Sequence, residues 1–250
     1  MEKRRSINLF GALRVFIAWI VSTLYVPVML SVCLCSSKAK RIPRGLAWVR
    51  FWGRMMTRIL GVRVRFTPAF RKALADRRPR VMTFNHSSSL DVLVGASLIP
   101  EGGVLVLKKE FRRIPLLGRA AAMVGSIFLD RGDREKAYAS LEAAANRIQT
   151  EKLQALIAPE GTRSKDGTMG RFKLGAFHLA HAAQASILPV VMHGNAALWP
   201  PGQFAPTRGT VVVDVLPEFR LEDGSPDALR VAANQLRDRY VDALAAGPNE

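Results

Sequence analysis

Three features that would point to particular chemistries are scarce or missing in this chain. Only two cysteines occur among the 250 residues, Cys33 and Cys35, and both lie in an apolar run where thiols behave as small hydrophobic side chains. No Gly-x-Ser-x-Gly sequence is present, and residues 87–89, three serines, lack the glycines of a nucleophile elbow, which argues against a serine hydrolase of that type. His178 and His181 form an i, i+3 pair without an obvious third ligand, so we expect neither a metal site nor a cofactor.

Acidic residues are scarce in the first third of the chain. Residues 1–80 hold 18 Lys and Arg against Glu2 and Asp76, whereas residues 81–250 hold 19 basic and 18 acidic residues. The formal net charge of +17 therefore belongs almost entirely to the N-terminal third. Such a charge favours an anionic surface or nucleic acid as partner. No nucleic-acid-binding motif is visible, and the aromatic residues of this region are grouped on an apolar helix, so we expect an anionic membrane surface and no nucleic acid.

The same third carries an uncharged run of 21 residues, 15–35, which is long enough to cross a bilayer as a helix. Pro27 lies inside the run and is expected to kink or break such a helix. Basic residues flank the run on both sides, whereas a single span usually has its positive end on the cytoplasmic side alone. We therefore favour a re-entrant hairpin or a helix that dips into the membrane and returns, over a true span. We expect the functional site of the chain to lie on the cytoplasmic face of a bacterial inner membrane.

Residues 47–61 predict an amphipathic helix. Arg50, Arg54 and Arg58 recur every fourth residue and so line one face, while Trp, Phe and Met side chains cover much of the rest. This pattern is typical of a helix lying among the headgroups of anionic lipids. The alternative is a helix that packs on its own domain with its arginines in water. We favour the membrane, because the uncharged run lies directly upstream.

Beyond residue 61, strand-like and helical stretches alternate. The expected strands are 61–66, 81–84, 104–107, 126–129, 156–158, 187–192 and 210–216, and the expected helices are 90–99, 116–123, 134–150, 173–183 and 226–246. Residues 71–80 are expected to be a charged connector, and 194–209, rich in Pro and Gly, a long loop near the functional site. The alternation predicts an α/β fold with a largely parallel sheet, mixed at its edge and flanked by helices.

Two of these strands end in residues that can do chemistry. His86 follows the strand that ends near Phe84, and Asp91 lies five residues later at the start of a helix. A carboxylate within reach of an imidazole fixes its tautomer and raises its basicity, so the pair suits a general base, although an isolated match of this spacing is common. The strand near residue 157 ends in a loop with Arg163, whose guanidinium suits phosphate. Ligands of α/β sheets bind at the carboxyl ends of strands, so we expect both loops to face one crevice. The alternative for Arg163 is an ion pair with Glu160.

Asn85-His86-(x4)-Asp91 together with Pro159-Glu160-Gly161-Thr162-Arg163 resembles the glycerophospholipid acyltransferase family, whose best-known members are the 1-acylglycerol-3-phosphate acyltransferases. Two weaker blocks of that family occur in order. They are Lys108-Lys109-Glu110-Phe111 with Pro115, Gly118 and residues 125–131, and then Ile187-Leu188-Pro189-Val190-Val191. The resemblance covers about residues 81–191. Ala158 departs from it, since the family usually has an aromatic residue or Val there, and this bears on packing more than on chemistry.

The resemblance implies transfer of a fatty acyl group from an acyl thioester, on coenzyme A or acyl carrier protein, to the sn-2 hydroxyl of 1-acylglycerol-3-phosphate. The product is phosphatidic acid for phospholipid biosynthesis. His86 would be the general base and Asp91 its orienting partner. Residues 1–61 would form a membrane-associated segment and residues 62–250 the acyltransferase domain, whose oligomeric state the sequence does not predict.

The acceptor's phosphate would be bound by Arg163 and Lys108, in a pocket shaped by Glu160, Gly161 and Thr162. Backbone N–H groups of residues 160–162 are candidate donors to the oxyanion of the tetrahedral intermediate. Arg131, in the second block, is a weaker candidate for the site, with a structural role as its alternative. Two alternatives stay open: an acyltransferase for another acceptor, such as glycerol-3-phosphate or a lyso-lipid without phosphate (lyso-ornithine lipid is one), and a non-catalytic lipid-binding protein.

Overall fold

Seven apolar segments pair into one sheet in the computed structural model, which describes residues 9–130, 134–164 and 167–248. The strands are β1 (Val62–Phe66), β2 (Arg80–Phe84), β3 (Gly103–Lys108), β4 (Ile127–Leu129), β5 (Gln154–Ile157), β6 (Ser186–His193) and β7 (Gly209–Val215). Their order is β1-β7-β6-β2-β5-β3-β4, and all pairs are parallel except β6–β7. Strands β5 and β6 are buried along their whole length, as expected for a sheet covered on both faces. The expected mixed α/β sheet is confirmed.

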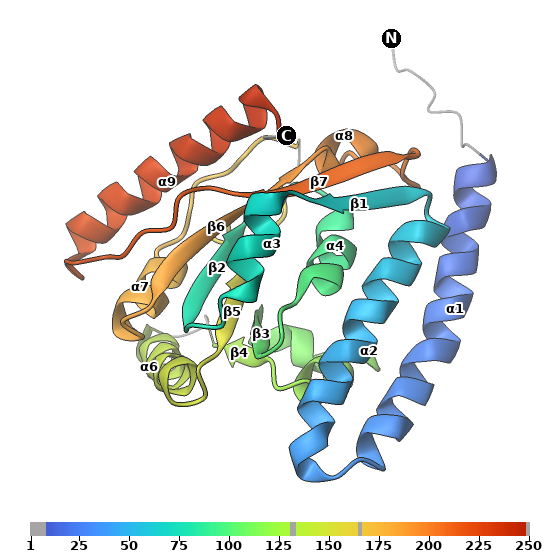
Figure 1. The fold of residues 1–250 in the computed structure, drawn as a ribbon, viewed down its shortest axis with the longest axis horizontal. Coiled ribbons are helices and arrows are strands. Elements are labelled where there is room, and N and C mark those ends of the chain that lie inside the picture. The colour runs from blue at the N-terminus through green and yellow to red at the C-terminus, as the bar shows by residue number, and fades with distance from the viewer. Residues whose placement is uncertain (1–8, 131–133, 165–166, 249–250) are drawn as a thin grey trace.

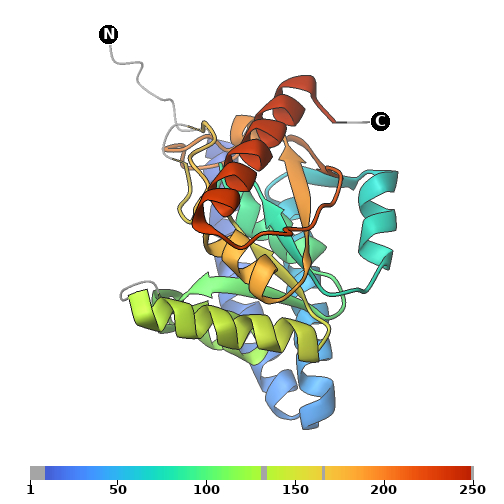
Figure 2. The ribbon, with the colours of Figure 1, turned by 90° about the vertical axis from the view of Figure 1, so that its left-hand side faces the viewer.

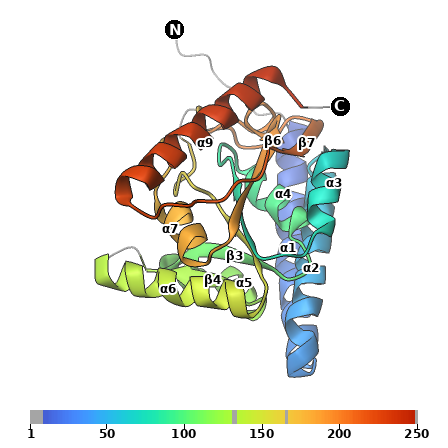
Figure 3. The ribbon, with the colours of Figure 1, turned by 60° about the vertical axis from the view of Figure 1, so that its left-hand side comes forward.

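Helices cover both faces of the sheet (Figures 2 and 3). On one face lie α6 (Arg134–Thr150), α7 (Gly175–Ala182) and α9 (Pro226–Ala246), whose buried side chains include Ile148, Phe177 and Tyr240. On the other face lie α2 (Lys38–Ile59), α3 (Pro68–Ala75), α4 (Leu90–Leu98) and α5 (Leu117–Met123). A short 3₁₀ turn, η1 (Lys109–Arg113), precedes α5, and α8 (Asn195–Leu198) follows β6.

Two expectations about connecting segments are corrected. The charged connector expected at 71–80 is wrong in its first half, because α3 extends to Ala75. The hydroxyl of Thr67 caps this helix by accepting from the backbone N–H of Phe70 at 3.2 Å, Pro68 occupies its first turn, and the Phe70 side chain is buried. The long loop expected at 194–209 begins instead with the single turn of α8, and Gly194 enters that turn at φ +91°.

The N-terminal part forms a helical hairpin (Figure 1). Helix α1 (Leu9–Leu34) continues through Pro27, so the expected break there is wrong; the chain reverses at residues 35–37 instead. The hydroxyl of Tyr25 donates to the Trp48 carbonyl at 2.9 Å, and the indole of Trp52 donates to the Ser22 hydroxyl at 3.1 Å, which joins the two helices. By length and composition, α1 is apolar enough to cross a membrane.

Helix α2 lies between α1 and α4. Its Leu46 and Met56 side chains are buried, and Gly53 lies against the α4 backbone. Arg50 donates to the carbonyl of Ile99 at 3.2 Å, and Arg54 is exposed. The expectation that lipid covers the apolar face of this helix is therefore wrong, because protein covers most of it. The large exposed apolar side chains lie mainly on α1.

Candidate active site

The carboxyl ends of three neighbouring parallel strands form one edge of the sheet. Thr83 of β2 is in register with Ile157 of β5, and Leu105 of β3 is in register with Leu156. His86 follows the end of β2, the loop at 158–164 follows the end of β5, and Lys108 ends β3. The parallel pairing therefore brings all three predicted segments to the edge where ligands of α/β sheets bind.

His86 and Asp91 are in direct contact. The Nδ1 atom of His86 lies 2.9 Å from Oδ2 of Asp91, and the same oxygen accepts from the backbone N–H of Ser88 at 2.8 Å. Asp91 lies in the first turn of α4, where the helix dipole favours a negative charge. Because a carboxylate only accepts, the Nδ1 atom carries the proton and Nε2 is left with a free lone pair. The His86 side chain is 23% exposed, whereas the Asp91 carboxylate is fully buried, so the base can meet a substrate while its partner stays dry.

Glu160 links the two motif segments. Its Oε1 accepts from the backbone N–H of His86 at 2.7 Å, and its Oε2 accepts from the backbone N–H of Gly170 at 3.0 Å. The N–H of Ser164 in turn donates to the carbonyl of His86 at 3.0 Å, so the His86 backbone is held from both sides. Burial raises the pKa of the Glu160 carboxyl, and these two backbone N–H donors oppose that rise.

Arg163 does not form the alternative ion pair with Glu160. Its exposed guanidinium donates to the hydroxyl of Ser89, in the segment between His86 and Asp91. The structure therefore brings Arg163 to the segment that carries His86 and Asp91. Lys108 is exposed at the end of β3, and Arg131 lies outside the described residues.

Gly161 and Thr162 occupy the turn after β5. Gly161 has φ +72°, a left-handed conformation that residues with a side chain rarely adopt. Its N–H donates to the carbonyl of Ala158 at 3.1 Å. That N–H is already used within the turn. The remaining candidate donors to an oxyanion in this loop are therefore the backbone N–H groups of Glu160 and of Thr162, which is exposed.

Two asparagines of the site had no role in the sequence-based prediction. The Asn85 amide donates to the carbonyl of Met192 at 3.1 Å and accepts from the N–H of Met192 at 2.8 Å, which fastens the end of β2 to β6. Asn195 is fully buried, and its amide donates to Oδ1 of Asp91. Asn85 is marked by its place in the motif, whereas Asn195 lies 104 residues from its partner and carries no local signal.

Within the described residues, no group of three or more His, Cys, Asp or Glu side chains could hold a metal ion. His178 packs edge-on against Tyr138, with ring centroids 5.9 Å apart. His193 is buried at the end of β6, where burial lowers the pKa of its imidazole.

A protein-family model described as Acyltransferase matches residues 46–193. The chain belongs to this family. The match begins in α2 and ends at the last residue of β6, so it contains His86, Asp91, Lys108 and the 158–164 loop.

Relatives named 1-acyl-sn-glycerol-3-phosphate acyltransferase match about two thirds of this chain. The 1-acyl-sn-glycerol-3-phosphate acyltransferase of Saccharomyces cerevisiae is 34% identical over 170 residues, covering 67% of this chain and 56% of the yeast protein. The human 1-acyl-sn-glycerol-3-phosphate acyltransferase alpha is 34% identical over 160 residues, covering 64% and 56%. The chain thus spans a little over half the length of these relatives. The crystal structure of the 1-acyl-sn-glycerophosphate acyltransferase PlsC from Thermotoga maritima has the same fold, with a TM-score of 0.77 and 22% identity over 97% of this chain and 98% of that one.

Proposed function

We propose that this acyltransferase-family protein transfers a fatty acyl group from an acyl thioester to the sn-2 hydroxyl of 1-acylglycerol-3-phosphate, making phosphatidic acid. The observation that carries the proposal is the 2.9 Å contact between His86 Nδ1 and the buried Asp91 carboxylate, at the sheet edge that also bears Arg163. The names of the yeast and human relatives supply the acceptor.

The chemistry follows from the free Nε2 atom of His86. As the lipid hydroxyl attacks the thioester carbonyl, Nε2 takes the hydroxyl proton and a carbon–oxygen bond forms. The resulting imidazolium is stabilised by Asp91. Collapse of the tetrahedral intermediate breaks the carbon–sulfur bond, and the leaving thiolate takes the proton back from the imidazolium. No protein nucleophile is needed, because the thioester is already activated.

The phosphate of the acceptor is assigned to Arg163 and Lys108. A guanidinium has five N–H donors, so the bond that Arg163 makes to Ser89 leaves donors for a phosphate. Glu160 shapes this pocket by holding the backbone of His86 and of Gly170. The oxyanion of the intermediate is assigned to the backbone N–H groups of Glu160 and Thr162.

The exposed apolar face of α1 is proposed to seat the catalytic domain on a cytoplasmic membrane surface, where the acceptor resides. The basic N-terminal third would strengthen the attachment to anionic lipid. The donor is proposed to be an acyl thioester of either coenzyme A or acyl carrier protein. Parallel assays with the two thioesters show which one supports the reaction.

The enzymatic proposal is tested with His86→Ala. Thiol release from acyl-coenzyme A in the presence of lysophosphatidic acid is expected to fall by roughly 10²–10⁴-fold, the usual worth of a general base. His181→Ala, which removes an exposed imidazole of α7, serves as the matched control and is expected to retain activity. Thiol release that His86→Ala leaves unchanged would contradict the general base, and release no faster than without protein would favour a lipid-binding protein without catalysis.

The acceptor is tested with Arg163→Ala and a panel of acceptors. KM for 1-acylglycerol-3-phosphate is expected to rise about tenfold or more, because a charge-assisted hydrogen bond to phosphate is lost, while KM for monoacylglycerol stays the same. Arg71→Ala, on the exposed face of α3, controls for the loss of a positive charge. An equal effect on both acceptors would contradict a phosphate contact and favour another acceptor class.

A further inference from the structure

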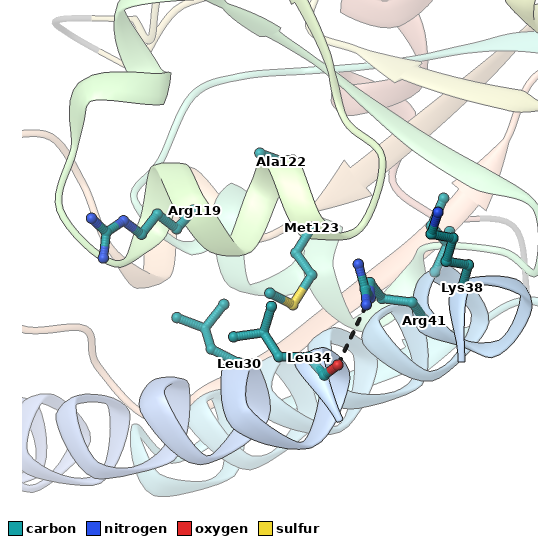
Figure 4. A pocket seen from close by; sticks show the side chains of 8 residues that line it. Leu30, Leu34, Lys38, Arg41, Arg119, Ala122 and Met123 are labelled. Atoms are coloured by element: carbon teal, nitrogen blue, oxygen red, sulfur yellow. Dashed lines mark hydrogen bonds between the residues drawn. The ribbon is translucent and has the colours of Figure 1, made fainter. Parts of the chain in front are cut away.

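A groove of about 580 Å³ lies between the end of α1, the start of α2 and α5, as Figure 4 shows. Leu30 and Leu34 of α1 line it from one side, and Met123 of α5 lines it from the other. Lys38, Arg41 and Arg119 are its cationic members, and none of the described residues that line it is acidic. Its chemistry is therefore that of a site for an anionic amphiphile.

The cations of the groove are arranged by the fold. Arg41 donates to the carbonyls of Cys33 at 3.2 Å and Leu34 at 3.4 Å, which fixes its guanidinium over the end of α1. Lys38 lies beside Arg41, whereas Arg119 lies at the opposite end of the groove (Figure 4). The Leu34 side chain continues the exposed apolar face of α1, so an acyl chain in the groove meets the same surface that is proposed to face lipid.

We propose that this groove binds one phospholipid with an anionic headgroup, its phosphate at Lys38 and Arg41 and an acyl chain along Leu30, Leu34 and Met123. The proposed site lies apart from the acceptor site. Arg14, near the other end of α1, donates to the carbonyl of Pro206, in the loop after α8; at the start of that loop the carbonyl of Trp199 accepts from the hydroxyl of Ser88, between His86 and Asp91. At 1.5 Å per residue, Leu30 lies about 24 Å further along the helix. The proposal concerns binding and does not depend on the proposed reaction.

The test is calorimetric titration of the whole protein with dihexanoylphosphatidylglycerol below its micelle concentration. Saturable binding is expected, and Lys38→Gln/Arg41→Gln is expected to weaken it about tenfold or more, at about 1 kcal/mol for each charge near a lipid surface. Arg71→Gln/Lys72→Gln on α3 removes the same charge elsewhere and is expected to leave the affinity unchanged.

Further arms of this titration can overturn the proposal. Dihexanoylphosphatidylcholine and inorganic phosphate are expected to bind at least tenfold more weakly, and Arg163→Ala is expected to leave the affinity for the anionic lipid unchanged. Absence of binding, equal losses in both double variants, or loss of binding in Arg163→Ala would each overturn a separate anionic-lipid site.

A second inference concerns Asn195 and rests on the proposed function. Its amide donates to Oδ1 of Asp91, while Oδ2 of Asp91 accepts from His86 and from the backbone of Ser88. Within the part of the chain that the structure describes, the Asn195 Oδ1 atom is buried without a hydrogen-bond partner. A buried oxygen without a hydrogen-bond partner destabilises the folded state, whereas the amide N–H of the same side chain supplies a donor to Asp91.

We infer that Asn195 is a positioning residue, which keeps the Asp91 carboxylate in the orientation that serves His86. Asn195→Ala is expected to lower kcat about tenfold or more with KM for the acceptor unchanged, because the contact acts through the base. Asn195→Ser, which keeps a hydroxyl donor, is expected to recover part of kcat.

A spectroscopic measurement separates this role from a structural one and from failure of the proposed function. The proton NMR signal of the His86 Nδ1–H bonded to Asp91 is expected to move upfield in Asn195→Ala, whether or not the enzyme turns over the tested substrate. An unchanged signal, or equal losses of kcat and substrate binding together with a lowered Tm, would overturn the inference.

Discussion

At the scale of single residues, the loop after β5 shows how a carboxylate can hold the backbone around a histidine. Glu160 was predicted as a shaping residue of the phosphate pocket, with an ion pair to Arg163 as the alternative. In the structure its two oxygens bind backbone N–H groups of His86 and Gly170. Its place in the motif is therefore explained by the path of the backbone around His86.

Glu160→Gln is expected to destabilise the protein by about 1–3 kcal/mol, because an amide has one acceptor oxygen, so the backbone N–H of either His86 or Gly170 loses its hydrogen bond to a charged carboxylate. Urea denaturation measures the change. Glu142→Gln, on the exposed side of α6, is the control and is expected to be nearly neutral. Equal stability of the two variants would contradict this role of Glu160.

The pH dependence of stability tests the same carboxyl. Burial raises the pKa of Glu160 above its ordinary value of 4.5, so above that pH the folded state binds more protons than the unfolded state. Protonated Glu160 contributes fully to the free energy of unfolding below the ordinary pKa of the unfolded state. This contribution is lost as the pH rises through the raised pKa of the folded state. The stability of the wild type relative to Glu160→Gln is therefore expected to be larger near pH 4.5 than near pH 7. A difference that grows with pH would contradict the raised pKa.

At the scale of elements, the contact between α2 and α4 decides how the hairpin joins the sheet. A Cβ atom at Gly53 would lie 2.6 Å from the backbone nitrogen of Ser97 and 2.7 Å from the carbonyl oxygen of Leu93. Only a glycine allows the two helices to approach this closely. The segment 1–61, predicted as a separate unit, is thus bound to the rest of the chain by backbone contact as well as by side chains; its boundary at residue 61 stays a prediction.

Gly53→Ala is expected to cost about 1–3 kcal/mol, because the helices must separate to admit the methyl group. Gly95→Ala in α4 is the matched variant: a Cβ there meets no atom within 4 Å, so better helix propensity is expected to stabilise the protein by about 0.5–1 kcal/mol. Denaturation curves of both variants measure the contrast. Similar stability of the two proteins would contradict the close approach of α2 and α4.

At the scale of the whole molecule, α1 carries the largest group of exposed apolar side chains among the described elements. Phe16, Trp19 and Leu24 of α1 are 61%, 70% and 68% exposed, whereas the two faces of the sheet are covered by helices. Large exposed apolar patches of this kind mark interaction surfaces. Together with the basic N-terminal third, this face supports a membrane location for the protein.

Phe16→Ser/Trp19→Ser is expected to weaken co-sedimentation with phosphatidylcholine–phosphatidylglycerol vesicles at least about tenfold, since burial of each large apolar side chain contributes about 1.5–3 kcal/mol. Tm is expected to stay nearly constant, because both side chains are exposed. Val231→Ser/Val241→Ser on α9 is the control and is expected to bind vesicles as the wild type does. Equal binding of all three proteins would contradict attachment through α1.

The sequence by itself determined those features that depend on neighbouring residues. Hydrophobic periodicity placed α6 and α9 at their observed bounds, since each helix buries one regular face. The spacing of His86 and Asp91 also favours their contact, because only five residues across a strand–helix junction leave the two side chains little conformational freedom. Only the tertiary structure decided what covers α2 and what holds Asp91. An apolar helix face has the same pattern whether lipid or protein covers it, and Asn195 reaches Asp91 through a sheet pairing between segments 104 residues apart.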